Sequence, residues 1–416
     1  MTSTQRTDGA FGGRILALAD RLAEISESPD ALTVTYLTPA HRAVAAKLRE
    51  WMQAAGMSVD MDAMANVIGR YAAADPQAKT LIVASHYDTV VNAGKYDGRL
   101  GLLTPLVIIE HLHRVEKKLP FHVELIAFSE EEGQRFPAAF ISSAALTGKF
   151  DPPLLETRDA AGLRLGDVMR EAGLDPGQIP ALARRPEDLL GYFEVHIEQG
   201  PVLLKERLPV GIVTSITGIL RYEVTVIGEA GHAGTVPMAL RRDAAAAAAE
   251  ILLSIERRCR ETPGVVGTVG KFAIPGGTIN IIPGRCELSI DIRAGDDATR
   301  DAAGADILAE IDRIASRRGV SIDVKEILRL APVPCSPRLQ NLLANAITRA
   351  GIPPYRLPSG AGHDAMMFDG VTELAMLFVR CGNGGVSHNP RETITAEDAD
   401  TGARILLDLI LNYVAH

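Results

Sequence analysis

Two hydrophobic periods alternate along the first part of the chain, one typical of helices and one typical of buried strands. Apolar residues recur every three or four positions in residues 11–27 and 39–55, which predicts two amphipathic helices. The apolar runs TLIVAS (80–85) and FHVELIAF (121–128) predict buried strands, and residues 99–118 between them predict a helix. Strands that alternate with helices predict an α/β fold, with a mixed sheet and helices on both of its faces.

The pattern changes near residue 215 and predicts a second domain. RYEVTVIG alternates as a strand does. The predicted elements are a strand at 221–228, a helix at 238–260, strands at 264–272 and 285–293, a helix at 298–318 and a strand at 320–327. The order βαββαβ is that of a ferredoxin-like unit. We therefore expect an inserted domain over residues 215–329, and a catalytic domain made of residues 1–214 and 330–416.

Composition and charge narrow the class of protein. The chain has 416 residues, of which 47% are hydrophobic and 23% charged, and its net charge is −9. An acidic chain without a basic patch argues against nucleic acid as a partner. No stretch of 18 apolar residues is present, so no membrane span is expected. Four dispersed cysteines and a polar N-terminus without an apolar leader fit a cytoplasmic protein.

An acidic run follows the second predicted strand. The sequence SEEEGQRF places Glu130, Glu131 and Glu132 next to one another where the apolar strand ends. Adjacent carboxylates repel each other, which raises their pKa values or requires a cation nearby. A triple glutamate is also common on solvated surfaces and at helix N-termini, where acids interact favourably with the helix dipole.

Other metal-binding residue types stand at or near further strand ends. These are His86 in SHYDTV, Asp97 in GKYDG, His196 in VHIEQG and His388 in GGVSHNP. Taken singly, each has an ordinary structural explanation, such as a hydrogen-bonded core histidine. Ligands of α/β sheets bind beyond the carboxyl ends of strands, so together these residues predict one site. Imidazole and carboxylate ligands suit zinc, manganese or cobalt, and a carboxylate that bridges two cations would explain the excess of acids.

Nine motifs resemble those of the peptidase M20 superfamily of dinuclear metal amidohydrolases. They are SHYDTV, GKYDGRLG, EEGQRF, HIEQGP, GHAGTVPM, NIIPG, DIR, PSGAGHDA and GVSHNP, and they run in order from about Ser85 to Pro390. The branch that they resemble most cleaves ureido groups: allantoate amidohydrolases, N-carbamoyl-L-amino-acid hydrolases and β-ureidopropionases. The resemblance implies two divalent metal ions per subunit, manganese or zinc, with cobalt and nickel as alternatives.

The resemblance also implies a set of metal ligands. His86, Asp97 and His196 match the ligands of one metal, and Asp97 bridges to the second. Glu132 and His388 complete the second metal.

Two further acids receive roles from the resemblance. Glu131 matches the general base, and Asp88 matches the acid that holds the tautomer of His86. Glu130 is expected to point to the other side of the strand end.

Substrate contacts are implied by motifs in both domains: Gln199, His232, Asn280, Arg293, Gly360 and His363. Arg293 with Asn280 would clamp a substrate carboxylate, because a guanidinium binds a carboxylate bidentately. His232 would stabilise the tetrahedral oxyanion. Gln199 would contact the ureido group, and His363 and Gly360 would shape the pocket. The alternatives are a surface ion pair for Arg293, a turn position for Asn280 and a loop position for His232.

The implied reaction is hydrolysis of a terminal ureido group to an amine, ammonia and carbon dioxide, in a homodimer formed through the inserted domain. The stretches RRDAAAAAAE and RCGNGGVSHNP favour an allantoate amidohydrolase. N-carbamoyl-L-amino-acid hydrolase and β-ureidopropionase are the alternatives within the branch. PAAFISSAALTG (137–148) departs from the branch pattern and leaves the substrate open. An M20 dipeptidase or deacylase and a non-catalytic metal-binding homologue are the alternatives outside it.

Overall fold

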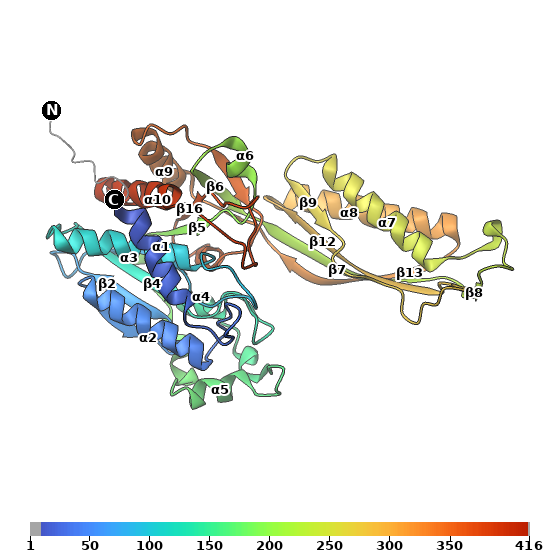
Figure 1. Ribbon diagram of the computed structural model, residues 1–416, viewed down its shortest axis with the longest axis horizontal. Coiled ribbons are helices and arrows are strands. Elements are labelled where there is room, and N and C mark those ends of the chain that lie inside the picture. The colour runs from blue at the N-terminus through green and yellow to red at the C-terminus, as the bar shows by residue number, and fades with distance from the viewer. Residues whose placement is uncertain (1–9, 415–416) are drawn as a thin grey trace. The chain divides into compact units, whose positions relative to one another are not determined.

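The computed structural model describes residues 10–414, which form two compact units (Figure 1). Unit 1 extends to Thr214 and also contains Cys335–Leu357 and the chain from His363 onward. Unit 2 contains Ser215–Pro334 and Pro358–Gly362. Unit 2 is therefore longer than the expected 215–329. Its last long strand ends only at Leu330, and β14 (Val333–Pro334) then pairs with Ile216 and Ser215.

Unit 1 is built on a mixed sheet whose strands follow the order β1-β2-β4-β3-β5-β16-β6. The strands are β1 (Ser58–Met61), β2 (Val67–Tyr71), β3 (Thr80–His86), β4 (His122–Phe128), β5 (Leu189–Ile197), β6 (Val210–Ile216), β16 (Leu374–Val379) and β15 (Arg356–Ser359), which also pairs with β6. The central strands β4, β3, β5 and β16 are parallel, and β2 and β6 run antiparallel to their neighbours β4 and β16.

Helices cover both faces of this sheet. One face shares a large apolar core with α1 (Ala10–Ala23), α2 (Pro39–Ala54), α3 (Arg99–Arg114), α9 (Pro337–Arg349) and α10 (Ala396–Asn412). On the other face, α4 (Ile141–Leu146) packs against the 3-10 helix η5 (Asp364–Phe368), and Phe368 contacts Phe128 and Tyr192 of the sheet. The expected α/β fold with a mixed sheet is confirmed.

Shorter helices fill the connections of unit 1. They are η1 (Pro152–Glu156), α5 (Leu165–Glu171), η2 (Pro176–Leu182), η3 (Pro186–Asp188) and α6 (Val202–Glu206). None of the helices in residues 10–414 is long and apolar enough to cross a membrane.

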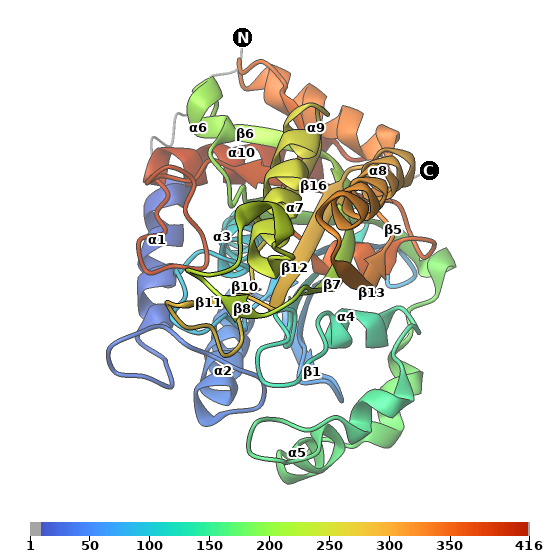
Figure 2. The same ribbon diagram turned by 90° about the vertical axis from the view of Figure 1, so that its right-hand side faces the viewer.

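Unit 2 is an antiparallel sheet with two helices that lie side by side (Figure 2). Its elements are β7 (Gly218–Ile227), α7 (Ala244–Arg260), β9 (Val265–Thr268), β10 (Phe272–Ala273), β12 (Arg285–Ala294), α8 (Asp297–Arg318) and β13 (Ser321–Leu330). The strands follow the order β13-β7-β12, and both β9 and β10 pair with β12. This order is consistent with the expected βαββαβ unit, except that the single strand expected at 264–272 is divided into β9 and β10. A small separate pair joins β8 (Gly231–His232) to β11 (Ile281–Ile282).

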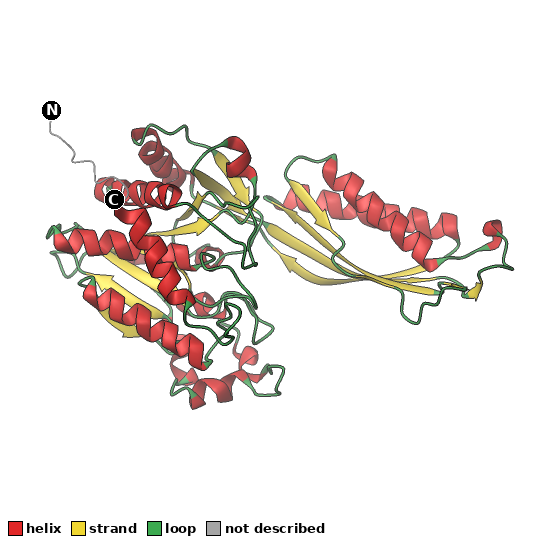
Figure 3. Ribbon diagram, viewed as in Figure 1, coloured by secondary structure: helices red, strands yellow, loops and turns green. Residues whose placement is uncertain are grey.

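The first helix of unit 2 begins later than the sequence pattern suggests. The predicted start is residue 238, but residues 238–240 form a single 3-10 turn (η4, Met238–Leu240), and α7 begins at Ala244 (Figure 3). Asp243 is the N-cap, and its carboxylate accepts hydrogen bonds from the backbone N–H groups of Ala245 and Ala246. An aspartate that satisfies these free donors fixes where a helix starts, whatever the apolar period before it.

Candidate metal centre

The parallel strands of unit 1 bring the predicted ligands to one edge of the sheet. His86 is the last residue of β3 and His196 is the next-to-last residue of β5. Glu132 follows the end of β4, and His388 lies in the segment after β16. Asp97 precedes α3, in the loop that leaves β3. Because these strands are parallel, their carboxyl ends meet, as the sequence pattern predicts.

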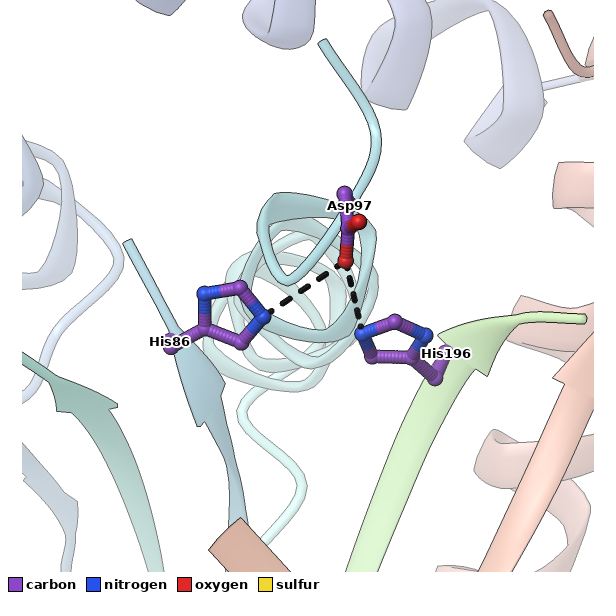
Figure 4. Close-up of side chains that lie close together, drawn as sticks. All are labelled: His86, Asp97 and His196. Atoms are coloured by element: carbon purple, nitrogen blue, oxygen red, sulfur yellow. Dashed lines mark ion pairs between the residues drawn. The ribbon is translucent and has the colours of Figure 1, made fainter. Parts of the chain in front are cut away.

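His86, Asp97 and His196 form the first group (Figure 4). Oδ1 of Asp97 lies 3.6 Å from Nε2 of His86 and 3.2 Å from Nε2 of His196. The two rings are stacked with their centroids 5.9 Å apart, and all three side chains are buried. The group therefore presents two imidazole nitrogens and one carboxylate oxygen to the same point.

The second group uses the other oxygen of Asp97. Oδ2 of Asp97 lies 3.1 Å from Nε2 of His388, which is 3.6 Å from Oε1 of Glu132. The side chain of His388 is half exposed, whereas Glu132 is nearly buried. Asp97 thus faces a different ligand group with each of its oxygens, which is the arrangement that a bridging carboxylate needs.

Hydrogen bonding indicates which nitrogen of His196 carries no proton and is therefore the candidate ligand atom. Nδ1 of His196 donates to the carbonyl oxygen of Ile197 at 2.9 Å, and Nε2 accepts from the backbone N–H of Gly98 at 3.2 Å. Nε2 therefore carries a lone pair that faces a carboxylate oxygen of Asp97. Two such acceptors repel each other unless a cation or a proton lies between them, so the residues present fit a metal ion.

Gly98 is required at the start of α3 by its conformation and its surroundings. Its φ is +64°, and a Cβ at this position would lie 2.5 Å from ring atoms of His86. Only glycine enters this conformation at little cost, and only glycine leaves room for the His86 ring.

Asp88 joins the His86 ring to the acidic segment. Its carboxylate lies 3.4 Å from Nδ1 of His86 and accepts hydrogen bonds from the backbone N–H groups of Glu131 and Glu132. Asp88 therefore contacts a histidine and two glutamates, and the hydrogen bond from Nδ1 of His86 goes to its backbone oxygen at 3.2 Å.

Glu131 is buried within reach of the first ligand group. Its carboxylate lies within 4.8 Å of ligand atoms of His86 and Glu132. Burial raises the pKa of Glu131 well above its usual range, against the opposing effect of His86. Glu130 is also buried, and neither of its carboxyl oxygens has a hydrogen-bond partner among residues 10–414.

Gln199, predicted to contact substrate, touches the ligands directly. Its Nε2 donates to Oδ2 of Asp97 at 2.8 Å and lies 3.4 Å from Nε2 of His388. Its φ is +55°, so the backbone at this position is in the left-handed region. In this arrangement Gln199 orients the shared carboxylate.

Two supporting residues were not anticipated from the sequence. Ser387 donates to Oδ2 of Asp97 at 3.0 Å, and Glu392 accepts from the backbone N–H groups of Tyr96 and Asp97 at 2.8 and 3.1 Å. Ser387 could have been found as the neighbour of His388 in GVSHNP. Glu392 lies in NPRET, which carries no recognisable signal.

His363 lies beside the first ligand group. Its ring is buried and packs edge-on against His196, with centroids 4.5 Å apart. Burial, followed by the charge of His196, lowers the pKa of His363 well below its usual range. The His363 ring therefore lines the site as an uncharged group. His363 also forms, with Glu194 and His196, a further group of side chains that could hold a metal ion.

Arg293 is held in unit 2 by contacts that orient its guanidinium. Nε and an amino nitrogen donate to the two oxygens of Asp291 at 2.8 and 3.2 Å, and Nη1 donates to the carbonyl oxygen of Gly360 at 2.8 Å. Of the five N–H donors of an arginine, two remain available. Gly360 therefore contributes its backbone carbonyl oxygen, which accepts a hydrogen bond from Arg293 and helps to orient the guanidinium.

Asn280 and His232 lie together, at the other end of β12 from Arg293. The backbone N–H of Ala233 donates to the carbonyl oxygen of Asn280, and His232 pairs with Ile281. β12 begins at Arg285, and Arg293 lies eight residues further along the strand, or roughly 27 Å at ~3.4 Å per residue. The expected clamp of Arg293 with Asn280 is therefore not assembled within one chain, because an extended strand separates the two residues.

Comparison with known proteins identifies the family. The model of peptidase family M20/M25/M40 matches residues 82–412. The chain belongs to this family. An N-carbamoyl-L-amino acid amidohydrolase of Geobacillus stearothermophilus is 39% identical over 396 residues, which cover 95% of this chain and 97% of that protein. Allantoate deiminase 1 of Glycine max is 36% identical over 424 residues, which cover 94% of this chain and 87% of that protein.

Solved structures agree with this assignment. An amidase of the hydantoinase/carbamoylase family from Burkholderia multivorans superposes on this M20 protein with a TM-score of 0.90 and 32% identity, over 96% of this chain and 97% of that one. The M20 resemblance and the expected class of fold are thus confirmed. M20 enzymes are dinuclear metal hydrolases, and the two groups that share Asp97 are this chain's candidate ligands.

Metal uptake by this M20 protein is expected to release protons and to weaken as pH falls. Before a cation binds, the hydrogen bond to Asp97 raises the pKa of His388 to about 9. Burial and the charge of Asp97 raise that of Glu132 to about 7. Below these values each group carries a proton that the cation must displace. Calorimetric titration with Zn²⁺ in buffers of different ionisation enthalpy gives the number of protons released per ion bound. Equal affinity for Zn²⁺ at about pH 6 and about pH 9 would contradict the expected weakening at low pH.

Proposed function

We propose that this protein is a metal-dependent amidohydrolase that hydrolyses the terminal ureido group of a small carboxylate substrate. The observation that carries the proposal is the position of Asp97 between two ligand groups, with buried Glu131 beside them. The names of the relatives support the ureido group as the target, because they are N-carbamoyl-L-amino acid amidohydrolases and allantoate deiminases.

Glu131 is proposed to move the protons of the reaction. Two divalent cations held by His86, Asp97, His196, Glu132 and His388 would supply Lewis acidity at the ureido carbonyl and make a water easier to deprotonate. A buried carboxylate with a raised pKa accepts a proton from the attacking water and later returns it to the leaving nitrogen. Overall R–NH–CO–NH₂ and one water give R–NH₂, ammonia and carbon dioxide.

Arg293 is proposed to bind the substrate carboxylate, because Asp291 and Gly360 fix the plane of its guanidinium and leave two N–H donors. Arg293→Met is expected to raise KM by about 10- to 100-fold with a smaller change in kcat, since a hydrogen bond to a charged group contributes about 1.5–3 kcal/mol. Arg221→Met is the matched control, because Arg221 also donates to Asp291, at 2.7 Å. Equal effects of the two variants on KM would contradict the assignment.

We also propose that the protein works as a homodimer in which His232 and Asn280 serve the site of the partner subunit. Both residues are exposed. Exposed apolar side chains stand near them along the chain, with Met238 77% and Ile279 fully exposed. Apolar surface of this kind usually marks an interface. This arrangement explains the separation of Asn280 from Arg293, because Arg293 would act in the site of its own subunit and Asn280 in the site of the partner subunit.

Mixing two inactive variants tests this arrangement. Glu131→Gln and His232→Ala are each expected to be inactive as homodimers. After subunit exchange, a mixed dimer contains one site with an intact Glu131 and an intact partner His232. Activity should return to about a quarter of the wild-type value for random pairing, since half the dimers are mixed and each has one intact site of two. A mixture that stays inactive, although mass spectrometry detects mixed dimers, would place His232 in its own subunit's site.

The substrate within the ureido class is decided by ammonia release. RRDAAAAAAE and RCGNGGVSHNP favour allantoate, whereas the 39% identical relative favours N-carbamoyl-L-amino acids. Protein loaded with manganese, the metal proposed alongside zinc, is tested on allantoate, N-carbamoyl-L-methionine, 3-ureidopropionate and a dipeptide. Turnover of the dipeptide alone would overturn the proposed reaction.

We place the protein in the cytoplasm, which the four buried, unpaired cysteines support.

A further inference from the structure

A pocket in unit 1, separate from the residues that the proposed reaction uses, lies against α2. Its volume is about 170 Å³. For comparison, a buried cavity of about 150 Å³ holds a benzene molecule. Its lining includes Arg42, Ala45, Ala46 and Arg49 of α2, together with His41 and Tyr87. We propose that this pocket binds a small carboxylate with an apolar body the size of one ring, and that its occupant regulates the metal centre.

One face of α2 gives the pocket its shape. Arg42, Ala45, Ala46 and Arg49 occupy positions i, i+3, i+4 and i+7, so they form a single stripe of the helix. The two alanines in the middle leave the space, and the two arginines stand at the ends of the stripe. Val67 and Leu37 are buried in the opposing wall. The result is an apolar hollow flanked by positive charge.

Arg42 and Arg49 lack partners of their own. Both side chains are exposed, and neither has an ion pair or side-chain hydrogen bond with any residue in the part of the chain that the structure describes. Two free guanidinium groups beside an apolar hollow are complementary to a ligand that combines a carboxylate with a hydrocarbon body.

His41 adds a buried polar atom to the wall. The ring is fully buried, and Nε2 donates to the carbonyl oxygen of Ser129 at 2.7 Å. Nδ1 is therefore an acceptor, and it has no hydrogen-bond partner among residues 10–414. Burial lowers the pKa of His41 to about 4, which keeps the ring neutral at physiological pH. A hydroxyl on the ligand would satisfy this acceptor.

Two wall residues connect the pocket to the metal centre. Ser129, which His41 holds, directly precedes the glutamate run that contains Glu131 and Glu132. Tyr87 follows the ligand His86, packs against the His41 ring with centroids 4.5 Å apart, and donates to the carbonyl oxygen of Ala65 at 2.8 Å. A bound molecule that shifts the Tyr87 ring would therefore move the backbone next to His86. One that shifts the His41 ring would move the backbone that leads to Glu131.

Calorimetry on the full-length, metal-loaded protein tests the binding. We expect saturable binding of phenylacetate or 4-methylpentanoate, and at least about tenfold weaker binding of the neutral isostere phenylacetamide. Ala46→Phe should abolish binding because it fills the pocket, and the double variant Arg42→Gln/Arg49→Gln should weaken it by about tenfold or more. Ala43→Phe and Lys47→Gln, on the same helix but outside the pocket, are the matched controls and should bind as the wild type does.

The outcomes separate this pocket from the proposed substrate site. Failure of both carboxylates to bind, or binding that survives Ala46→Phe and is lost in Arg293→Met, would overturn the proposal. The regulatory part rests on the proposed ureido hydrolysis: phenylacetate should change kcat for the ureido substrate in the wild type and not in Ala46→Phe. Unchanged kcat with phenylacetate bound would refute regulation. Because calorimetry does not depend on turnover, loss of the proposed function and loss of this pocket's binding are distinguishable.

Discussion

Glu131→Gln is expected to lower kcat by about 10²- to 10⁴-fold, the usual contribution of a general acid–base group, and to leave the metal content unchanged. The amide keeps the size of the side chain but can no longer accept and return a proton. Glu131 is buried beside His86 and Glu132, so little water is present to replace it as a base. Ammonia release measures kcat, and elemental analysis measures bound metal per chain.

Glu130→Gln is the matched control for this experiment. Glu130 is the neighbouring residue and is equally buried, but its carboxyl oxygens have no hydrogen-bond partner in the described part of the chain. Burial raises the pKa of Glu130 well above its usual range, and an amide of the same size replaces the carboxyl group without loss of a hydrogen bond among the described residues. Glu130→Gln should therefore retain most of the activity. Unchanged turnover in Glu131→Gln would rule out the proposed mechanism.

Asp97→Asn is expected to remove metal from both ligand groups and to abolish turnover. The carboxylate offers one oxygen to His86 and His196 and the other to His388. An amide has only one oxygen and no charge, so it cannot bridge two cations. The metal content should fall from about two ions per chain to less than one.

Ser387→Ala gives the comparison for Asp97→Asn. It removes a hydroxyl that lies 3.0 Å from Oδ2 of Asp97 and 2.8 Å from Oε2 of Glu392 and accepts from Nε2 of Gln199 at 3.3 Å, but it keeps the Asp97 carboxylate. Loss of such a supporting contact usually weakens metal affinity by about 10- to 100-fold, so this variant should refill when metal is added in excess. An Asp97→Asn protein that still holds two ions per chain would show that the carboxylate does not bridge.

The sequence predicted best those features that depend on regular periods. The apolar runs that became β3 and β4 are buried on both faces, so their composition alone identified them. His86, Glu132 and His196 followed because a parallel sheet brings strand ends together. The β1–β2 hairpin was not foreseen, since the outer strand β1 is only four residues long and mostly exposed.

Features that depend on long-range hydrogen bonds could not be predicted. Glu392 supports Asp97 from 295 residues away, and no local pattern records that contact. Asp291 is a different case, because it lies two residues from Arg293 on the same face of β12, so the period of the strand could have indicated this contact. The separation of Asn280 from Arg293 required the strand pairing of β12 to be known.

The bond between Glu392 and the Asp97 loop also sets when the site can form during biosynthesis. The other candidate ligands, up to His196, leave the ribosome first, and His388 and Glu392 follow His196 by 192 and 196 residues. N-terminal segments begin to fold during synthesis, at about 5–20 residues per second. A nascent chain therefore carries an incomplete set of candidate ligands until residue 392 has been synthesised. Stable acquisition of both metal ions is expected only after this segment has been synthesised, and premature termination before residue 388 should yield a chain that cannot retain the second ion.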